Sequence, residues 1–267
     1  MALPLNLPQT FLPERRLLAK LLAFTADDSG CGDKEVISAA TGIPTGKSTG
    51  KVEPMIRYAQ GMGLISAVKT QGQWQLSLTA LGQIVRREDP FLSEPVTIWL
   101  LHLMLCRRSG LNPPAEGIAK AWFTLFADSH FRLGQRFTQA AYLDLLIERH
   151  GKKNYLSSVS SVVLRSYLEP SSLACSPATL SPLTLEADQS GRFQDQWIVR
   201  HSAPGEQRSF PVYAAGFYLN WDELFTGEPQ LALAEFAGQS RFFTVLGWNE
   251  ALIARWLDWM TDQGMLQ

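Results

Sequence analysis

The sequence predicts a mostly helical α+β protein, and three observations predict that class. Apolar residues recur at helical spacing along much of the chain, and strand-like runs are few and short. The chain has 267 residues, enough to bury a full core and to divide into two or three subdomains. Its 46% of hydrophobic and 18% of charged residues are typical of an ordered globular protein.

Three helices are expected near the beginning of the chain. Pro13 and Glu14 open the run ERRLLAKLLAF, and DDSGCG after it reads as a turn. The apolar stripe of this first helix consists of Leu17, Leu18, Leu21, Leu22 and Phe24. A short helix should follow at about 33–41, where Gly42 ends it, and a third helix at about 51–61.

A two-stranded ribbon should follow the third helix. The runs LISAVKT and WQLSLT flank the turn QGQ, and Thr79 then begins another helix. Helix, helix, turn, helix and ribbon is the order of a winged helix-turn-helix domain, which we place at residues 12–87. In such a domain the third helix usually enters the major groove of DNA, and the ribbon touches the phosphate backbone.

The stretch GIPTGKSTGK, at residues 42–51, has the letters of a nucleotide-binding loop. A Walker-type loop needs four residues between its first Gly and the Gly-Lys-Ser/Thr, but only three separate Gly42 from Gly46. Such a loop also follows a buried strand, whereas residues 33–41 have a helical pattern. We therefore predict that the chain binds neither ATP nor GTP, and we expect no cofactor.

In a winged helix the same stretch becomes the turn before the third helix, whose N–H groups can receive a DNA phosphate. Lysines there would neutralise phosphates, and small hydroxyl residues would hydrogen-bond to them. The candidate DNA-binding residues of this domain are Lys47, Ser48, Thr49, Lys51, Arg57 and Lys69. The alternative is a winged helix that only docks a protein, with Lys47 and Lys51 solvated.

A second helical module is expected at residues 88–168. The run 95–106 should form a helix that is apolar on nearly all sides and therefore buried. It contains His102, which we expect to be a core residue with one hydrogen bond, and not a ligand or a catalytic base. Further helices are expected at about 115–127 and 136–149.

The basic turn HGKKN precedes one more helix, which should begin near Ser157 and end at Leu168. The two helices around this turn are either a second helix-turn-helix or a plain helical hairpin whose turn is basic. The candidate DNA-binding residues of this module are Lys152, Lys153, Asn154, Ser157 and Arg165.

Residues 169–182 are rich in Ser and Pro, which indicates an interdomain linker. A mixed α/β C-terminal domain would then cover residues 183–267. It should contain strands at about 192–200 and 209–219, followed by an amphipathic helix. The apolar stripe of that helix consists of Leu252, Trp256, Trp259 and Met260.

The net charge is −1, but the charges are unevenly distributed. Residues 14–70 hold eight Lys or Arg against six Asp or Glu, and residues 132–168 hold six against two. Residues 171–267 hold five against eleven. We therefore expect anionic partners to meet the first two regions, and solvent or a basic protein to meet the third.

The sequence favours binding over catalysis. It has no G-x-S-x-G or H-E-x-x-H motif, and its four histidines and three isolated cysteines lack the spacing of metal ligands. We therefore expect no metal site and no enzyme. No apolar run reaches the ~18 residues of a membrane span, and the start lacks the positive region of a signal peptide. These features predict a cytoplasmic protein.

Two stretches resemble a known family: TGIPTGKSTGKVEPMIRYAQGMGLI and LTALGQIVRREDPFLSEPVTIWLLH. They are similar to an uncharacterised prokaryotic family that is often encoded beside phosphoadenosine-phosphosulfate-reductase-like proteins. Those loci are linked to DNA sulfur modification and phage defence. The matching residues are Gly46, Lys47, Gly50, Lys51, Ile56, Arg57, Tyr58, Asp89, Pro90, Thr97, Trp99, Leu100, Leu101 and His102. The match covers about the first 105 residues, and it implies a context without assigning catalytic residues.

We therefore expect a DNA-binding, non-catalytic component of a multi-protein DNA-modification or anti-phage defence assembly, with double-stranded DNA as its ligand. The partner proteins that the resemblance implies are a reductase-like sulfur-transfer protein and an ATPase. A protein–protein adaptor that docks such a partner through the winged helix is the first alternative. A transcriptional regulator is the second.

Overall fold

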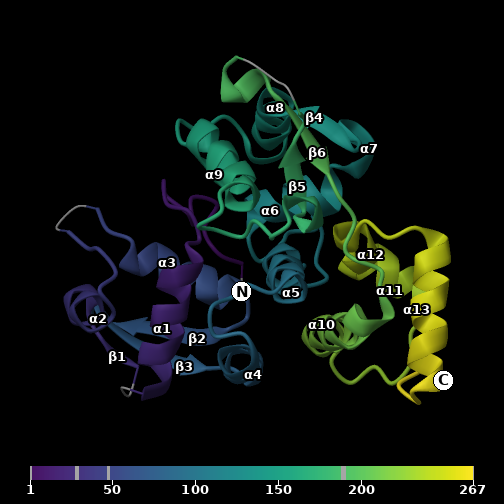
Figure 1. Cartoon of the computed structure of the whole chain (residues 1–267), viewed down its shortest axis with the longest axis horizontal. Helices are drawn as coiled ribbons and strands as arrows, with labels where there is room; N and C mark the ends of the chain where they lie inside the picture. The colour runs from purple at the N-terminus through teal and green to yellow at the C-terminus, as the bar shows by residue number, and fades with distance from the viewer. Residues whose placement is uncertain (1, 28–29, 47–48, 188–190, 267) are drawn as a thin grey trace.

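The structure is a computed structural model that describes residues 2–27, 30–46, 49–187 and 191–266 (Figure 1). It is mostly helical with small antiparallel sheets, which confirms the predicted α+β class. Three groups of elements surround one central helix, α5, in Figure 1. In the part of the chain that is described, no helix combines the length and the apolar character that a membrane span requires.

The first group contains three helices, a three-stranded sheet and a fourth helix. Its elements are α1 (Arg15–Asp27), β1 (Cys31–Gly32), α2 (Lys34–Thr41), α3 (Val52–Gly61), β2 (Ile65–Thr70), β3 (Gln73–Leu78) and α4 (Ala80–Glu88). The sheet order is β1-β3-β2, and both pairings are antiparallel. The predicted caps form: Gly42 ends α2 with a φ of 67°, and the Thr79 hydroxyl begins α4 by accepting from the N–H of Gly82.

Helix α5 (Pro95–Cys106) lies at the centre of the molecule, and ten of its twelve residues are buried. It packs against α3 of the first group, α6 of the middle group, and α10 and α12 of the last group. Because helices cover it on several sides, an apolar surface around the whole helix is stabilised by burial.

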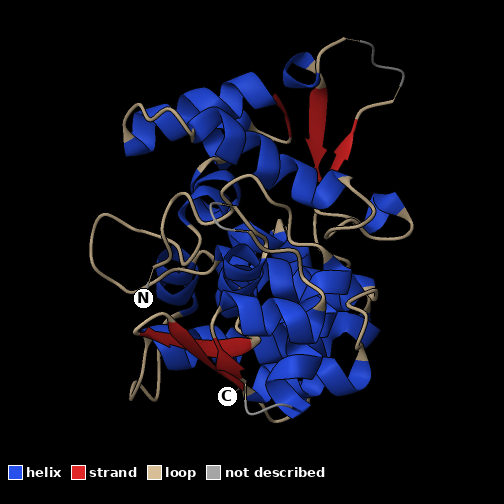
Figure 2. Cartoon of the chain, turned by 90° about the vertical axis from the view of Figure 1, so that its left-hand side faces the viewer, coloured by secondary structure: helices blue, strands red, loops and turns tan. Residues whose placement is uncertain are grey.

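The middle group combines helices with a second sheet of three short strands. Its elements are α6 (Lys120–Phe123), a π-helical turn (Thr124–Asp128), α7 (His130–Leu133), β4 (Arg136–Thr138), α8 (Gln139–His150), α9 (Leu156–Leu168), β5 (Leu183–Leu185) and β6 (Trp197–Arg200). The strand order is β4-β6-β5, so the sheet joins residues on both sides of the segment 169–182. Figure 2 shows this sheet at the opposite end of the view from the first one.

The last group is helical. Its elements are α10 (Phe210–Leu224), α11 (Leu233–Ser240), α12 (Phe242–Leu246) and α13 (Glu250–Asp262). The predicted stripe of α13 is confirmed, because Trp256 and Met260 are fully buried while Leu252 and Trp259 pack partly buried against the core.

Three sequence-based assignments were wrong. Residues 115–119 are not helical, since the backbone there pairs with 105–109, and the helix expected at 115–127 is a short α-turn followed by a π-helical turn. Residues 136–138 form a strand, so the next helix starts at Gln139. The strand expected at 209–219 is helix α10, because its buried residues Phe210, Tyr213 and Phe217 recur at helical spacing and pack on one face.

Residues 169–182 are packed and not an exposed tether. Leu173 is fully buried, and its N–H donates to the carbonyl of Ser166 at 2.7 Å. The indole N–H of Trp99 donates to the carbonyl of Leu180 at 2.8 Å. The Ser172 hydroxyl donates to the carbonyl of Pro13 at 3.2 Å. Through these bonds the segment holds α1, α5 and α9 in fixed positions.

Candidate nucleic-acid interface

Helix α3 is the element that the sequence favours for reading DNA, yet seven of its ten residues are buried. Tyr58 is fully buried, its hydroxyl donates to the carbonyl of Phe11 at 2.9 Å, and its ring meets Trp122 edge-on with centroids 5.8 Å apart. A Cβ on Gly61 would lie 2.9 Å from Leu105, so the end of α3 touches α5. The side of α3 that faces these residues is therefore closed to DNA.

The two candidate cations of α3 and the ribbon share one carboxylate. Arg57 and Lys69 both approach the carboxylate of Glu53, at 3.9 Å and 3.4 Å. Both cations also lie over the ring of Trp74, at 4.9 Å and 5.0 Å from its centroid. Burial of the Trp74 ring under two cations gives Arg57 and Lys69 a packing role in addition to their charge.

The Gly-rich stretch before α3 is held by its own hydrogen bonds. The N–H of Lys51 donates to the carbonyl of Pro44 at 2.8 Å, and the Lys34 ammonium donates to the carbonyl of Gly46 at 2.9 Å. The Lys51 ammonium forms an ion pair with Glu14 at 2.5 Å, and Thr49 is exposed. Lys47 and Ser48 lie outside the described residues. Lys51 is therefore the member of the predicted cluster that contacts the start of α1, through its ion pair with Glu14.

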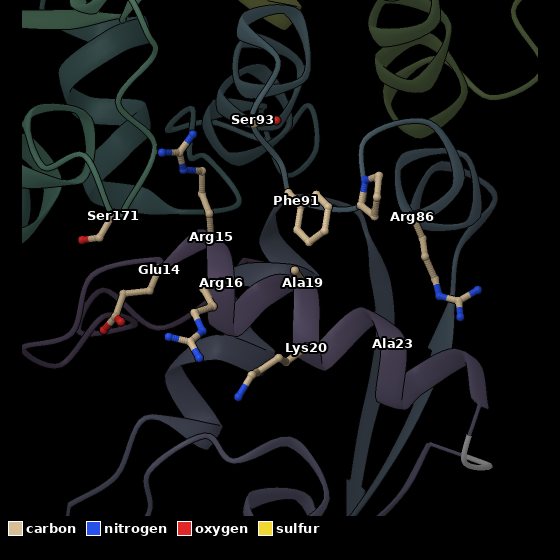
Figure 3. A pocket seen from close by; sticks show the side chains of 11 residues that line it. Glu14, Arg15, Arg16, Ala19, Lys20, Ala23, Arg86, Phe91, Ser93 and Ser171 are labelled. Carbon is tan, nitrogen blue, oxygen red and sulfur yellow. The ribbon is translucent and has the colours of Figure 1, made fainter.

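An open groove of about 1060 Å³ runs along α1 on this side of the molecule (Figure 3). Helix α1 forms one wall, and the segment between α4 and α5 forms the other. The residues that line the groove are Glu14, Arg15, Arg16, Ala19, Lys20, Ala23, Arg86, Pro90, Phe91, Ser93 and Ser171. Four of them are basic and one is acidic, and that acid, Glu14, is the ion-pair partner of Lys51. The groove therefore carries a net positive charge.

Three of the four cations of this groove have no carboxylate partner among the described residues, and two of these three also form no side-chain hydrogen bond there. Arg15 donates to the carbonyls of Leu92 and Pro170, and Arg86 pairs with Asp27 at 2.8 Å. Arg16 and Lys20 form no ion pair with any residue in the described ranges. They lie four residues apart on one face of α1, where like charges repel by about 0.2–0.5 kcal/mol. A bound anion would relieve that repulsion.

The local sequence explains why α1 presents these cations. Leu17, Leu18, Leu21 and Leu22 are buried against the core, which fixes the rotation of the helix. Arg16 and Lys20 then fall on the outer face. Sequence analysis did not select Arg16, Lys20, Arg86 or Phe91. The spacing of Arg16 and Lys20 opposite the leucine stripe, with no acid between them, was the available signal.

Arg15 ties the groove to the segment that follows α9. The Arg15 guanidinium donates to the carbonyl of Pro170 at 2.5 Å, and the backbone N–H of Arg15 donates to the carbonyl of Ser171 at 3.0 Å. Arg165 lies one turn earlier, at the end of α9, where it pairs with Glu169 at 3.0 Å. Lys51 thus contacts a residue that lines the groove, Glu14, while Arg165 is paired with Glu169, just before the segment that carries Ser171.

The remaining candidates lie at the other end of α9. Lys152, Lys153, Asn154 and Ser157 are exposed on the turn before the helix and at its start. Ser157 lies eight residues before Arg165, about 12 Å along the helix, and the turn with Lys152, Lys153 and Asn154 precedes the helix. They form a second basic patch and not part of the groove.

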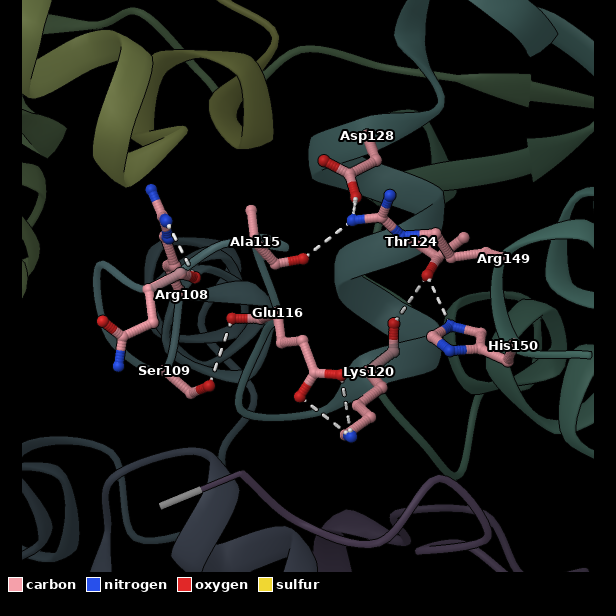
Figure 4. A network of polar contacts seen from close by, with 10 residues as sticks. Arg108, Ser109, Ala115, Glu116, Lys120, Thr124, Asp128, Arg149 and His150 are labelled. Atoms are coloured by element: carbon pink, nitrogen blue, oxygen red, sulfur yellow. Dashed lines mark hydrogen bonds and ion pairs between the residues drawn. The ribbon is translucent and has the colours of Figure 1, made fainter.

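A second cavity, of about 470 Å³, lies between α6, α8 and the loop before α6 (Figure 4). Its charges are paired: Lys120 with Glu116 at 2.9 Å, Arg149 with Asp128 at 3.1 Å, and Arg132 with Glu148 at 2.5 Å. The side chain of Thr124 donates to the carbonyl of Lys120, so the His150 Nε2 that lies 3.0 Å away serves as donor to it. A threonine bonded in this way is not activated as a nucleophile.

Burial shifts the pKa values of two groups in this network. Desolvation raises the pKa of Asp128 against the opposing effect of Arg149. Desolvation also lowers the pKa of His150, and the charges of Lys120 and Arg149 act in the same direction. Within the described ranges, no group of three or more His, Cys, Asp or Glu side chains could hold a metal ion.

His102 is a core residue, as the sequence predicts. It is fully buried, and its Nδ1 lies 2.7 Å from the hydroxyl of Tyr167. The rings of Trp99, Phe126 and Tyr167 meet it edge-on. Burial lowers the pKa of His102 from 6.5 to about 3, so the imidazole is neutral at physiological pH.

Comparison with known proteins relates the chain to one solved fold. No protein-family model matches it, and no curated protein matches it. A crystal structure of magnesium ion-bound SspB is similar over 98% of this chain and 79% of its own chain, with a TM-score of 0.69 and 17% sequence identity. At that identity the likeness concerns the fold alone, and it extends over nearly the whole of this chain.

Proposed function

We propose that this protein binds double-stranded DNA by its phosphate backbone, along the groove of α1. The observation that supports the proposal is the pair Arg16 and Lys20, which line an open groove without a carboxylate partner among the described residues. Lys51 pairs with Glu14, which lines the groove, and Lys152 and Lys153 offer a second, separate basic patch. Backbone contacts of this kind give affinity with little sequence preference.

We infer that the first group of elements is a winged helix-turn-helix domain. The order α1-β1-α2-α3-β2-β3 with sheet order β1-β3-β2 supports this assignment. In this domain α3 is largely buried, and its Arg57 is ion-paired with Glu53. We therefore propose that DNA lies against α1 and the turn before α3, with Thr49 and Lys51 at its edge, and that α3 does not enter the major groove.

The protein would act as a non-catalytic, cytoplasmic component of a multi-protein DNA-modification or anti-phage defence assembly. The resemblance of residues 41–65 and 78–102 to a family from such loci supports this role, and the likeness of fold to SspB agrees with it. Its partners there would be a reductase-like sulfur-transfer protein and an ATPase. DNA held by basic groups on one face would leave the acidic last group free to meet these proteins.

An adaptor that binds partner proteins is a second candidate, and one observation favours it. An apolar groove of about 940 Å³ lies between α10, α11 and the segment after α13. Its exposed apolar residues include Leu233 and Met265, and its two charged residues, Asp222 and Glu228, are both acidic. Such a surface suits a basic amphipathic segment of a partner. The two candidates use different faces, so one chain can serve both.

Charge reversal tests the DNA proposal. We expect Arg16→Glu with Lys20→Glu to weaken binding of a 20-base-pair duplex roughly tenfold or more, about equally for unrelated sequences. The slope of log Kobs against log salt should become less steep by about 1.8, because two phosphate contacts are lost. Fluorescence anisotropy of a labelled duplex measures both the affinity and the salt slope. A range of roughly 50 to 300 mM salt is wide enough to resolve a slope of this size.

The matched control is Arg192→Glu with Arg208→Glu, which changes the net charge equally at exposed sites of the acidic half. This control should leave the salt slope unchanged. Equal losses in both double variants would mean that net charge alone governs binding, and the groove would then not be the site. Duplex binding that requires a partner protein and is absent in the isolated chain would favour the adaptor.

A further inference from the structure

Phe91 is the side chain of the groove that its charges do not explain. It is 75% exposed and lines the groove that Arg16 and Lys20 also line. Figure 3 shows its ring standing over Ala19 of α1, with Arg15 on one side and Arg86 on the other. A phenylalanine in this position loses the stabilisation that burial would give its ring.

The segment that carries Phe91 is held rigidly. The buried carboxylate of Asp89 accepts from the N–H groups of Ser93 at 3.0 Å and of Glu94 at 2.9 Å. The N–H of Leu92 donates to the carbonyl of Asp89 at 3.0 Å. Phe91 is therefore exposed because an ordered turn presents it, and not because the turn lacks structure.

The turn also contains a strained residue. Leu92 has a φ of 54°, a left-handed conformation that is unfavourable for a residue with a branched side chain and is usually taken by glycine. Leu92 is fully buried, and the Arg15 guanidinium donates to its carbonyl at 3.4 Å. Burial of Leu92 thus anchors the turn while its strained backbone directs the preceding ring outward. Backbone strain of this kind clusters at functional sites in proteins.

The chemistry around the ring selects one class of ligand. An aromatic face beside several cations is the arrangement with which proteins hold unstacked nucleobases, since the ring stacks on the base and the cations meet the adjacent phosphates. A protein partner of apolar surface would have to bury Arg16 and Lys20 against it without a carboxylate from this chain, which is costly. The charges of the groove therefore favour nucleic acid.

We infer that Phe91 stacks on a nucleobase that has left the duplex stack, as in a single-stranded gap or a flipped nucleotide. Arg16 and Lys20 would hold the phosphates on either side of that nucleotide. This inference rests on the proposed DNA binding and names its preferred substrate: a duplex with an unpaired segment. Phe91 would then supply the preference for unpaired bases, and the cations would supply the affinity for all DNA.

The test compares an intact duplex with the same duplex carrying a short gap that contains 2-aminopurine, whose fluorescence falls when it stacks on an aromatic ring. The full chain should bind the gapped DNA more tightly and quench the probe. Phe91→Ala should weaken binding of the gapped DNA between about 5-fold and about 150-fold, weaken intact-duplex binding far less, and abolish quenching. Phe91→Trp should retain all three properties.

Phe131→Ala is the control, because Phe131 is fully exposed on α7, away from the groove. It should bind both DNAs as the wild type does. If the wild type binds both DNAs equally, or if Phe91→Ala binds the gapped DNA as tightly as the wild type, the inference is wrong while DNA binding stands. The second result would make Phe91 a protein-contact residue. If neither DNA is bound, the proposed function itself fails and the inference with it.

Discussion

Helices α1 and α5 are of nearly equal length, 13 and 12 residues, but their surfaces differ completely. Helix α1 buries its leucines on one side and presents Arg16 and Lys20 on the other. Helix α5 has no charged residue and is buried almost throughout. Helix α1 therefore keeps its cations accessible to a ligand. Helix α5 instead contributes the packing between the three groups of elements.

The difference teaches where chemistry can occur in this chain. The one titratable imidazole of α5, His102, is surrounded by aromatic rings and stays neutral, so its environment removes its capacity to accept a proton near pH 7. The cations of α1 are in contact with solvent. A substitution should accordingly change stability when it is made in α5 and change binding when it is made in α1.

The largest effect is expected from Trp99→Ala in α5. The Trp99 side chain is 1% exposed, and its indole N–H donates to the carbonyl of Leu180. Removing the ring leaves a cavity and should lower the free energy of unfolding by about 3–5 kcal/mol. Urea denaturation monitored by circular dichroism measures this change.

Trp99→Phe separates the two contributions at this position. It keeps most of the apolar volume and leaves the Leu180 carbonyl unpaired, so its cost should be the smaller, about 1–3 kcal/mol. A cost for Trp99→Ala below 1 kcal/mol would contradict the view of α5 as the packing centre.

The second effect is a pH dependence of stability that His102 causes. Because burial lowers its folded pKa from 6.5 to about 3, the unfolded chain binds more protons between these two values. The free energy of unfolding should therefore fall as pH decreases through this window. His102 alone should contribute a loss of about 2 kcal/mol between pH 7 and pH 5.

His102→Gln tests that assignment. The variant should be less stable than the wild type at pH 7, because it loses the hydrogen bond to Tyr167 and alters the packing. Its free energy of unfolding should also fall less steeply on acidification. Burial also lowers the pKa values of His130, His150 and His201, so the difference between variant and wild type is the quantity to measure. Parallel pH profiles for the two proteins would show that His102 does not titrate in this window.

The same contrast explains which parts of the structure the sequence could predict. Helices α1, α2, α3 and α5 follow from apolar spacing and from caps such as Gly42 and Thr79, all of which are local signals. The strand β4 could not be predicted in this way, because three residues become a strand only when β6, about 60 residues later, lies beside them. Helix α10 did carry a local signal, since Phe210, Tyr213 and Phe217 recur at helical spacing, and the expectation of a strand there overlooked it.

The candidate site shows a similar limit. The Gly- and Lys-rich pattern of residues 42–51 predicted phosphate contacts at the turn before α3. In the structure, Lys51 of this turn has a carboxylate partner, Glu14. The groove depends on α1, on the turn of Phe91 and on Ser171 from a distant segment, and no local pattern announces such a combination. Only the position of Arg16 and Lys20 opposite a leucine stripe was visible beforehand.

A third and smaller effect concerns the ion pair between Lys51 and Glu14. Both side chains are 29% exposed, so we expect a coupling energy of about 0.2–1 kcal/mol in a double-mutant cycle with Lys51→Gln and Glu14→Gln. Thermal or urea denaturation of the four proteins gives this energy, and it should decrease in high salt.

DNA binding gives this cycle a second readout. Glu14→Gln should strengthen duplex binding, because it releases Lys51 and removes the only acid of the groove. Unchanged binding in Glu14→Gln would place the phosphates away from this end of α1.

The smallest change in stability is expected from Lys20→Glu. This substitution should leave the free energy of unfolding unchanged or raise it, while it lowers the affinity for duplex DNA. In the wild type, Arg16 and Lys20 repel each other across one helical turn, and the substitution converts this repulsion into an attraction. The variant should therefore be as stable as the wild type or more stable by a few tenths of a kcal/mol. Its affinity for duplex DNA should nevertheless fall, since a phosphate would meet a carboxylate. Melting temperature and anisotropy measured on the same preparation should move in opposite directions. A residue that only supports the fold would lose both together, so a destabilised Lys20→Glu variant would mean that Lys20 belongs, like Trp99, to the structure and not to the binding face.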